Sequence, residues 1–251
     1  MKMSEIPGVE HFELFVKFTK AEYVDSLLDG NFYMNNINFY IELENNSKTK
    51  GVGDKWEAAH VFQFDEMYYM DSEEDKVIKL LGKGELITRF EKSREVPVYC
   101  FSKFTAKDYS LYEDTDEYMS FRLDIGDDLR KFKEFGDTAV IFPVNIGEAL
   151  REAAHSKGMD SVFKEVTYNG FSDKTLGEMD EFHKGSVDMF FRKNEMFKYQ
   201  REVRLALYNT FVDNHFSLET QNIKEHSIVS PIEQFLERSA ILAYKNDEAL
   251  D

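Results

Sequence analysis

The sequence is poor in cysteine and in basic residues, and each shortage excludes a class of protein. Cys100 is the one cysteine in 251 residues, so no intramolecular disulfide can form. Lysine and arginine number 31 against 48 aspartate and glutamate, which gives a formal net charge of −17. A surface this acidic repels phosphate backbones and anionic lipids. We therefore expect no DNA or RNA binding through bulk charge.

Long apolar runs and a secretory signal are also missing. No stretch approaches the roughly 20 apolar residues of a membrane span. The first residues, MKMSEIPGVEHFE, lack the apolar centre of a signal peptide. These absences predict a cytoplasmic protein without a membrane anchor. The acidic balance is compatible with a protein partner, in particular a basic one.

Common catalytic signatures are absent as well. The chain has no G-x-S-x-G elbow, no phosphate-binding P-loop and no H-E-x-x-H helix. None of its six histidines stands at the close spacing typical of metal ligands, so the sequence predicts no metal site. Cys100 lies inside the apolar stretch VPVYCFSKF, which favours an unreactive core thiol.

The sequence is rich in aromatic residues, with 23 phenylalanines and 13 tyrosines that can fill a large core. Strand-like and helix-like segments alternate irregularly, without repeats or a linker. The prediction is one α+β domain over residues 1–251, with a mixed, largely antiparallel sheet and flanking helices. An acidic C-terminal tail from about residue 245 is expected to fray.

The chain opens with a strand–helix–strand pattern. Phe12–Phe18 is rich in β-forming residues, and Thr19-Lys20-Ala21-Glu22 has the spacing of a capping box. Gly30 is placed to end the helix in the left-handed conformation. A second strand is predicted over Phe32–Ile41.

The later segments give the following predictions. Strands are expected at 61–69, 85–91, 96–104, 119–125, 138–144, 162–168 and 215–219. Helices are expected after Ser72 up to Gly82, after Asn145, over 176–191, and from Ser230 to about 244, with a helix or turn at 127–135. Residues 42–55 and 108–117 are predicted loops. Trp56, between Asp54 and Glu57, indicates either a turn pinned by a buried ring or a loop over a pocket.

The stretch FKYQREVRLAL, Phe197–Leu207, is the strongest candidate for chemistry. Read as a strand, it places Tyr199, Arg201, Val203, Leu205 and Leu207 on one face, and Lys198, Gln200, Glu202 and Arg204 on the other. The second face carries an amide, a carboxylate and a guanidinium in a row. Two interpretations stay open, a pocket-lining row or a solvated face on which Glu202 and Arg204 merely pair.

Four segments recur in a fixed order: FVKFTKAEYVDSLLDGNFYMNN, GDKWEA, VYCFSKF and FKYQREVRLAL. The ordered set resembles an uncharacterised prokaryotic and phage domain family, whose members have a KF-type strand and helix, a G-D-x-x-E turn, a CFS strand and a late Y-Q-x-E-x-R strand. The resemblance runs from about Phe15 to Leu207. It implies no single activity.

The chain is also similar, more weakly, to ADP-ribosyltransferases, which begin strand–helix–Gly–strand and carry a late Q-x-E or E-x-E strand. This resemblance implies an NAD or nucleotide pocket. Breaking the nicotinamide–ribose bond builds positive charge at the ribose carbon, which a fixed carboxylate stabilises. Glu202 would supply that carboxylate and Gln200 would orient the acceptor.

The same resemblance implies a cofactor-binding set in which Lys17 or Thr19 lies near the ribose or pyrophosphate, Ser102 or Tyr99 lies near the nicotinamide, and Arg204 lines the pocket. The chain departs from the pattern at Lys17, where those transferases carry arginine or histidine.

A non-enzymatic interaction protein, such as a phage factor that binds a host protein, is the alternative. Enzyme function predicts that Lys17, Ser102 and Glu202 converge on one cleft. The alternative predicts a flat acidic or aromatic patch instead, for example around Tyr109, Tyr112 and Tyr118.

Overall fold

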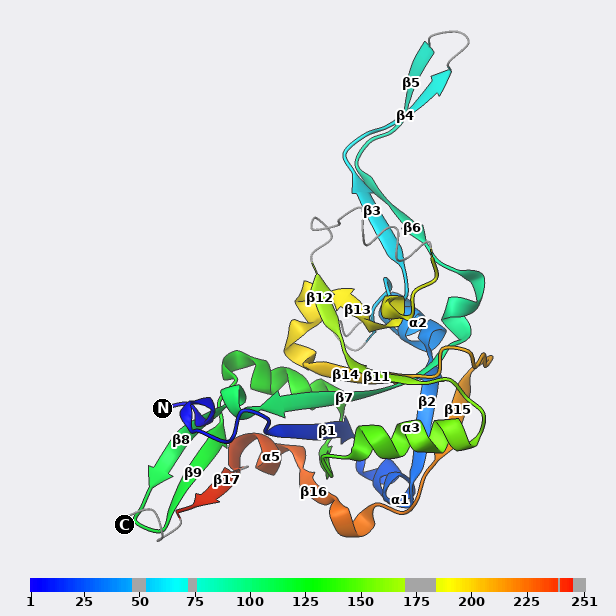
Figure 1. Cartoon of the computed structure of the whole chain (residues 1–251). Helices are drawn as coiled ribbons and strands as arrows, with labels where there is room; N and C mark the ends of the chain where they lie inside the picture. Colours follow the sequence, from blue (N-terminus) through cyan, green and yellow to red (C-terminus); the bar gives the residue numbers. More distant parts are fainter. Residues whose placement is uncertain (47–52, 72–75, 170–183, 239, 246–251) are drawn as a thin grey trace.

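The computed structural model describes residues 1–46, 53–71, 76–169, 184–238 and 240–245. It has an α+β fold built on a mostly antiparallel eight-stranded sheet. Six strands follow the order β11-β14-β7-β1-β10-β16, while β2 pairs with both β7 and β15. Figure 1 shows the sheet at the centre of the body and a long hairpin that projects from it.

The strands of the large sheet have these bounds: β1 Glu13–Thr19, β2 Asn31–Asn36, β7 Pro97–Thr105, β10 Thr138–Phe142, β11 Val162–Glu165, β14 Glu202–Ala206, β15 His215–Glu219 and β16 Ile228–Pro231. Four smaller sheets contain β3 His60–Phe64 with β6 Gly84–Thr88, β4 Met67–Asp71 with β5 Lys76–Leu81, β12 Thr167–Asn169 with β13 Arg192–Asn194, and β8 Tyr109–Asp114 with β9 Tyr118–Leu123 and β17 Ala240–Tyr244. Of these pairs, β12 with β13 is parallel.

The described α-helices are short: α1 Val24–Leu28, α2 Ile37–Asn46, α3 Ile146–Ser156 and α5 Ile232–Arg238. The 3-10 segments are η1 Met3–Glu5, η2 Ala21–Tyr23, η3 Glu91–Glu95, η4 Ala106–Asp108, η5 Gly126–Phe135, η6 Val187–Phe191, η7 Glu195–Gln200 and η8 Lys224–His226. No described helix is both long enough and apolar enough to pass through a bilayer.

Side-chain alternation along β1 divides the core between the two faces of the sheet. Phe15 packs in a cluster that includes Phe101 and residues of α1 and α3. Val16 and Phe18 pack on the other face with Phe104 and residues of α5. A third cluster forms around Ile37 of α2.

The first strand, the helix after it and its end at Gly30 form as predicted, with a different cap. Gly30 has a φ of +90°, the left-handed conformation expected of it. The predicted capping role of Thr19 is wrong, since Lys20 is the cap residue and makes no side-chain cap hydrogen bond. The Ala21 amide donates instead to Asp137 Oδ1 at 2.8 Å, so a residue far along the chain satisfies the first turn.

Several element predictions are wrong, because tertiary pairing overrides the local pattern. The predicted loop 42–55 begins inside α2, which ends at Asn46. The strand 32–41 ends at Asn36 and continues as α2, while the helix after Ser72 is β5 over its described part. The loop 108–117 contains β8, and the last helix ends at Arg238, before β17. The strand 197–207 begins only at Glu202. Much of the predicted helix 176–191, and the tail from 246, lie outside the described residues.

The break at Arg201 accompanies contacts with residues that are distant in the sequence. Residues Glu195–Gln200 form η7, and Arg201 takes a left-handed conformation with φ 50°. The Arg201 guanidinium donates to Asp108 Oδ1 at 2.5 Å, and its carbonyl accepts from the Lys103 amide. At this turn the chain changes from η7 to the strand β14. The alternation of side chains expected along 197–207 therefore holds only from Glu202 onward.

Candidate functional site

The large sheet splits where β1 and β2 diverge along one edge of β7. Strand β1 pairs with β7 from Glu13 opposite Thr105 to Val16 opposite Ser102. Strand β2 pairs farther along the same edge, with Asn35 opposite Val98. In the described registers, the segment 99–101 of β7 therefore has no partner strand at this edge. The split leaves the Cys100 carbonyl available to a side chain.

Lys17 of β1 fills this split. Its Nζ donates to the Cys100 carbonyl at 2.8 Å and lies 4.5 Å from the centre of the Tyr99 ring. Burial lowers the pKa of Lys17, although Glu202 acts in the opposite direction across the sheet. Within the described part of the chain, no ion pair of Lys17 with a carboxylate is formed. The ammonium group is thus held by a carbonyl and an aromatic face, with capacity for an anion.

The larger of two cavities at the split has a volume of about 610 Å³. It lies between β1 and β2 and is covered by residues of η2, α1 and α2. Lys17, Thr19 and Tyr99 line it, and all three were predicted to bind the cofactor. Its other aromatic lining includes Tyr23, Tyr33 and Tyr40. The lining therefore combines one ammonium group with several tyrosine rings.

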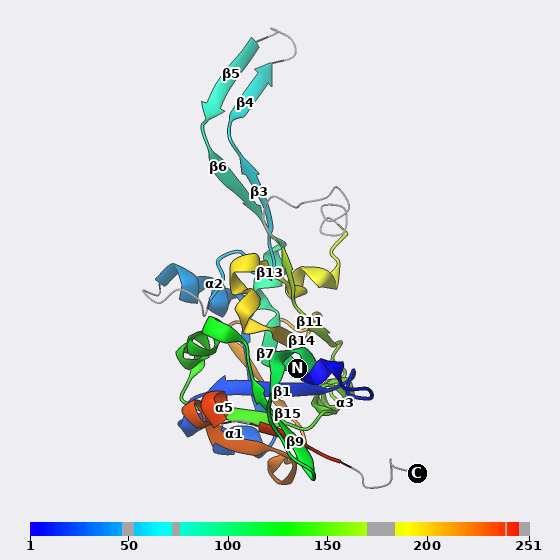
Figure 2. The same ribbon diagram turned by 90° about the vertical axis from the view of Figure 1, so that its left-hand side faces the viewer.

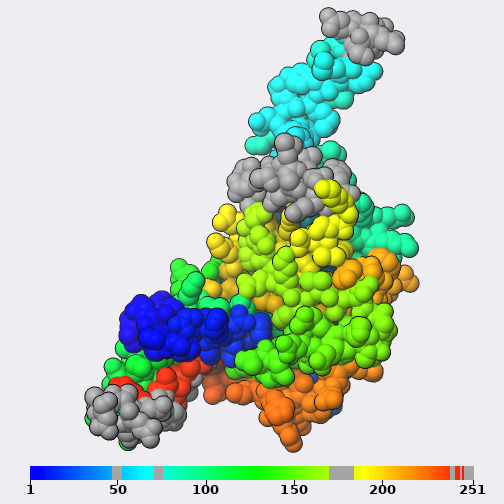
Figure 3. All heavy atoms as spheres, in the orientation of Figure 1, coloured from blue at the N-terminus to red at the C-terminus, as the bar shows by residue number. Residues whose placement is uncertain are grey.

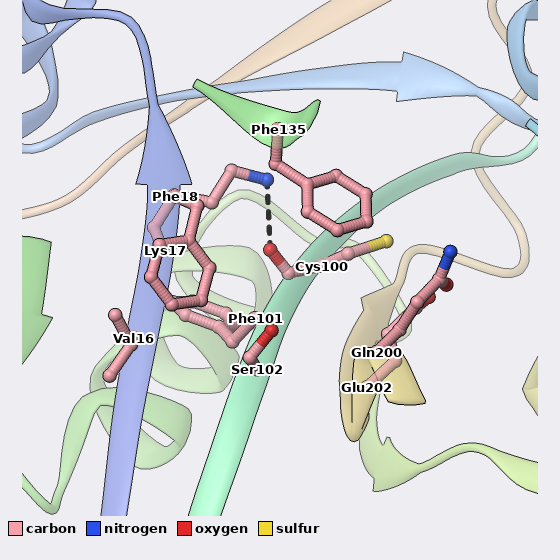
Figure 4. A pocket seen from close by; sticks show the side chains of 9 residues that line it. All are labelled: Val16, Lys17, Phe18, Cys100, Phe101, Ser102, Phe135, Gln200 and Glu202. Atoms are coloured by element: carbon pink, nitrogen blue, oxygen red, sulfur yellow. Dashed lines mark hydrogen bonds between the residues drawn. The ribbon is translucent and has the colours of Figure 1, made fainter. Parts of the chain in front are cut away.

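The smaller cavity, about 60 Å³, adjoins Lys17 and contains the rest of the predicted set except Arg204. Ser102, Gln200 and Glu202 line it together with Cys100 and Phe135. Figure 4 shows Lys17 and Ser102 approaching from β1 and β7, with Gln200 and Glu202 side by side on the neighbouring segment. Lys17, Ser102 and Glu202 thus lie around one hollow.

Glu202 is buried, and two cations hold its carboxylate. Lys193 Nζ donates to Glu202 Oε2 at 2.6 Å and to Gln200 Oε1 at 2.9 Å. Arg204 Nε donates to Glu202 Oε1 at 2.7 Å. The Glu202 amide donates to the Tyr168 hydroxyl at 2.8 Å. The interpretation of this row as a solvated polar face is wrong, because Gln200, Glu202 and Arg204 are all buried.

Arg204 continues the network to the loop before β3. Its Nη1 and Nη2 donate to the two carboxylate oxygens of Glu57 at 2.8 and 2.9 Å. Nη1 also donates to the Phe190 carbonyl at 2.7 Å. Arg204 is fully buried and lines neither of the two cavities, so its predicted pocket-lining position is not borne out by the geometry. It holds the wall behind Glu202.

The network balances two carboxylates against two cations. Burial alone raises the pKa of Glu202, but Arg204 and Lys193 outweigh it and hold that pKa well below its usual range. Burial lowers the pKa of Lys193, yet Glu202 and Glu57 raise it overall. Glu202 therefore stays ionised at neutral pH. Burial also raises the pKa of the Cys100 thiol to about 12, in keeping with the unreactive thiol expected.

Lys193, Glu57 and Asp54 were not predicted as site residues. Asp54 is buried beside Glu57, and burial followed by the Glu57 charge raises its pKa to about 6. Asp54 and Glu57 flank Trp56, a half-buried ring, so the G-D-K-W-E turn was the available signal for this pair. Nothing in the sequence around Lys193 marked it as their partner.

No family model matches the chain. Neither a curated protein nor a solved structure gives a significant match. Both resemblances therefore stay predictions, and the site must be interpreted from its own geometry. Among the described residues, no group of histidine, cysteine, aspartate or glutamate side chains could hold a metal ion.

Proposed function

We propose that the protein binds a nucleotide-type ligand, NAD in the first instance, in the cleft between β1 and β2. The observation that supports this most directly is Lys17. Its ammonium group lies in the split of the sheet, bonded to a carbonyl and not paired with a described carboxylate, at the edge of a cavity of about 610 Å³. A phosphate group of the ligand would complete the environment of this cation.

The size and lining of the cavity suit such a ligand. Small-molecule sites have volumes of roughly 300–1,000 Å³ and combine aromatic walls with a few polar groups. Tyr23 and Tyr33 are more than half exposed and so present their rings to the cavity and to solvent. A base can stack on such rings, while Lys17 fixes the anionic end.

The reaction that we propose is ADP-ribosyl transfer. Glu202 is the charge-stabilising carboxylate and Gln200 the orienting group, with Ser102 beside them. In support, all three line the hollow next to Lys17, and Glu202 is ionised at neutral pH. Lys193 and Arg204 offset part of the negative field of Glu202, which bears on the transfer step and not on ligand binding. The two steps are therefore tested separately. A cytoplasmic location, where NAD is abundant, belongs to the same proposal.

Calorimetric titration with NAD tests the binding step. Lys17→Met removes the charge at nearly constant length and should weaken NAD binding about 10- to 100-fold, the effect of losing one charge-assisted hydrogen bond. Lys133→Met is the matched control, because Lys133 is exposed, pairs with Glu233 and lines neither cavity. Absence of heat with the wild type, or equal weakening by both variants, would remove this assignment of the cleft.

Nicotinamide release tests the transfer step. Wild type incubated with NAD and a panel of acceptor proteins should release nicotinamide, and Glu202→Gln should abolish the release. Because Glu202→Gln also breaks a buried ion pair, its folding is checked by circular dichroism and its NAD affinity by calorimetry. Binding without release in the wild type would remove the transferase step and leave a binding protein.

The alternative of a partner-binding protein also has an observation in its favour, at a different place from the one predicted. The expected patch around Tyr109, Tyr112 and Tyr118 is not a flat aromatic surface, because Tyr109 is fully buried in the core. Tyr112 is exposed, with the Arg122 guanidinium 3.3 Å from its ring centre. Exposed apolar side chains concentrate instead on the projecting hairpin.

A further inference from the structure

The projecting hairpin, residues 60–71 and 76–88 and called the arm below, consists of two ribbons in series. Strands β3 and β6 form the part next to the body, and β4 and β5 form the distal part. Figures 1 and 2 show the arm extending from the body in two perpendicular views, and Figure 3 shows that its distal part stands clear of the other side chains. The arm therefore contributes little to the core of its own chain.

The distal ribbon is apolar on both faces. Tyr69 lies opposite Ile78, and Met70 lies opposite Val77, so neighbouring pairs present apolar side chains to opposite sides. Their exposed fractions are 51% and 42% for the first pair, and 74% and 58% for the second. Further exposed apolar side chains of the arm are Phe62, Tyr68, Leu80, Leu81 and Leu86. While both faces of the ribbon stay in water, these apolar side chains contribute no burial free energy to its stability.

The arm also lacks neighbours along its edges. Within the described residues, β4 and β5 pair only with each other, so each presents one open row of backbone donors and acceptors. A two-stranded ribbon alone in water is marginally stable at best. Both features indicate a surface that is covered when the protein is assembled.

We propose that the arm pairs with the arm of a second copy of this chain in a two-fold symmetric dimer. The available area fits such an interface. Nine side chains of the arm, each about half exposed, leave roughly 700–900 Å² uncovered over the two faces of the ribbon, taking roughly 150–200 Å² for a fully exposed side chain. A standard stable interface takes roughly 800 Å² from each partner. Two-fold symmetry uses the same patch twice and leaves no unmatched surface.

The distribution of charge favours a second copy joined through the arms rather than through the bodies. The chain as a whole carries −17, and two such bodies repel each other at short distance. The described residues of the arm carry −1, with Asp65, Glu66, Asp71 and Glu85 against Lys76, Lys79 and Lys83. The connection between β4 and β5 adds three carboxylates, so residues 60–88 carry −4 and the rest of the chain carries −13. Arm pairing keeps the bodies farther apart than a Debye length of about 8 Å.

Analytical ultracentrifugation of the full chain tests the proposal. The wild type should sediment with twice the chain mass of 29.5 kDa at concentrations from about 1 to 100 µM. Met70→Thr with Val77→Thr should give a monomer, since threonine keeps the strand propensity and removes one apolar face. Val144→Thr is the matched control, because Val144 is 77% exposed but lies outside the arm, and it should stay dimeric.

A truncation separates loss of the interface from loss of folding. Phe64 and Gly84 are cross-strand partners, so an Asn-Gly turn can join them in place of 65–83. This variant should keep the circular dichroism and NAD response of the wild type and sediment as a monomer. A wild type that is monomeric throughout would overturn the proposal. A dimer that survives the truncation would overturn it too.

Discussion

Arg204 and Glu57 form a two-pronged ion pair in a fully buried position, although 147 residues separate them in the chain. The pair fastens β14 of the large sheet to the turn before β3. Arg204 also bonds Glu202, and Lys193 bonds both Glu202 and Gln200, so the wall of the smaller cavity depends on this contact.

Breaking this pair should destabilise the protein strongly. Arg204→Met leaves Glu57 buried without its main partner, and we expect a loss of roughly 3–5 kcal/mol in the free energy of unfolding measured with urea. Lys164→Met is the control, because Lys164 is the cross-strand neighbour of Arg204 but forms an exposed pair with Asp188, worth at most about 1 kcal/mol. Equal losses would contradict a special role of the buried pair. Adding Glu57→Met to Arg204→Met should recover part of the loss, since it removes the stranded charge.

Asp54 should make stability fall as pH rises from about 4 to about 6. Its pKa is raised from 3.8 to about 6, so in this window the folded state binds a proton that the unfolded state has lost. The stability that the neutral Asp54 carboxyl contributes is fully present below the pKa of Asp54 in the unfolded state. It is lost as the pH rises through the pKa of Asp54 in the folded state. In the wild type, the Trp56 amide donates a hydrogen bond to Asp54 Oδ1 at 2.9 Å. Asp54→Asn keeps a side-chain oxygen that can accept this hydrogen bond.

We expect Asp54→Asn to stabilise the fold by roughly 2–3 kcal/mol above pH 6, given about 1.4 kcal/mol for each pKa unit. The gain should shrink below pH 6 and vanish near pH 4. Urea unfolding of both proteins across this range measures it. A gain that does not change with pH would show that the pKa of Asp54 is the same in the folded and unfolded states.

Gly30 should tolerate no side chain. At its φ of +90°, a Cβ would lie 2.6 Å from the Gln221 carbonyl oxygen and 2.7 Å from that of Thr220, both backbone atoms. Gly30→Ala should therefore lower the free energy of unfolding by more than the roughly 1 kcal/mol of left-handed strain alone. Gly126→Ala is the matched control, with φ +62° and no atom within 4 Å of its Cβ. If the two variants lose the same stability, crowding by the loop at Thr220 is not important.

Binding of NAD should weaken as pH rises through the lowered pKa of Lys17. Burial disfavours its charged form, and a bound phosphate restores that form by raising the pKa, so binding takes up protons in this range. The calorimetric heat should accordingly depend on the ionisation enthalpy of the buffer. Lys17→Met should show a flat pH profile with no proton uptake. If the wild-type pH profile is as flat as that of Lys17→Met, Lys17 does not bind the ligand.

The sequence predicted the fold class and the inward side of β14, because alternation from Glu202 onward survives in the structure. Each wrong element prediction concerns a segment whose secondary structure is set by residues that contact it from elsewhere in the chain. Val77, Leu80 and Leu81 have helical spacing after a capping serine, but pairing with Met67–Asp71 makes the segment a strand. The left-handed backbone at Arg201 depends on Asp108, which no pattern around 197–207 could indicate.

The site was predictable in part for the same reason. Glu202, Ser102 and Lys17 come from strands that alternation orients, and at the smaller cavity they meet Gln200, the last residue of η7. The partners of Glu202 could not be found this way, because Lys193 lies on a short parallel ribbon and Glu57 lies in a turn. The split of the sheet at Cys100 follows from which strands share β7, and a single sequence does not state strand order.

The anchoring of the arm has a mechanical consequence. Strand β3 begins three residues after Glu57, and Ala58 between them is fixed in a left-handed conformation with φ 48°. The base of the arm is thereby joined through Glu57 to Arg204, which lies on the same strand as Glu202. We expect a displacement of the arm to reach that strand through this ion pair.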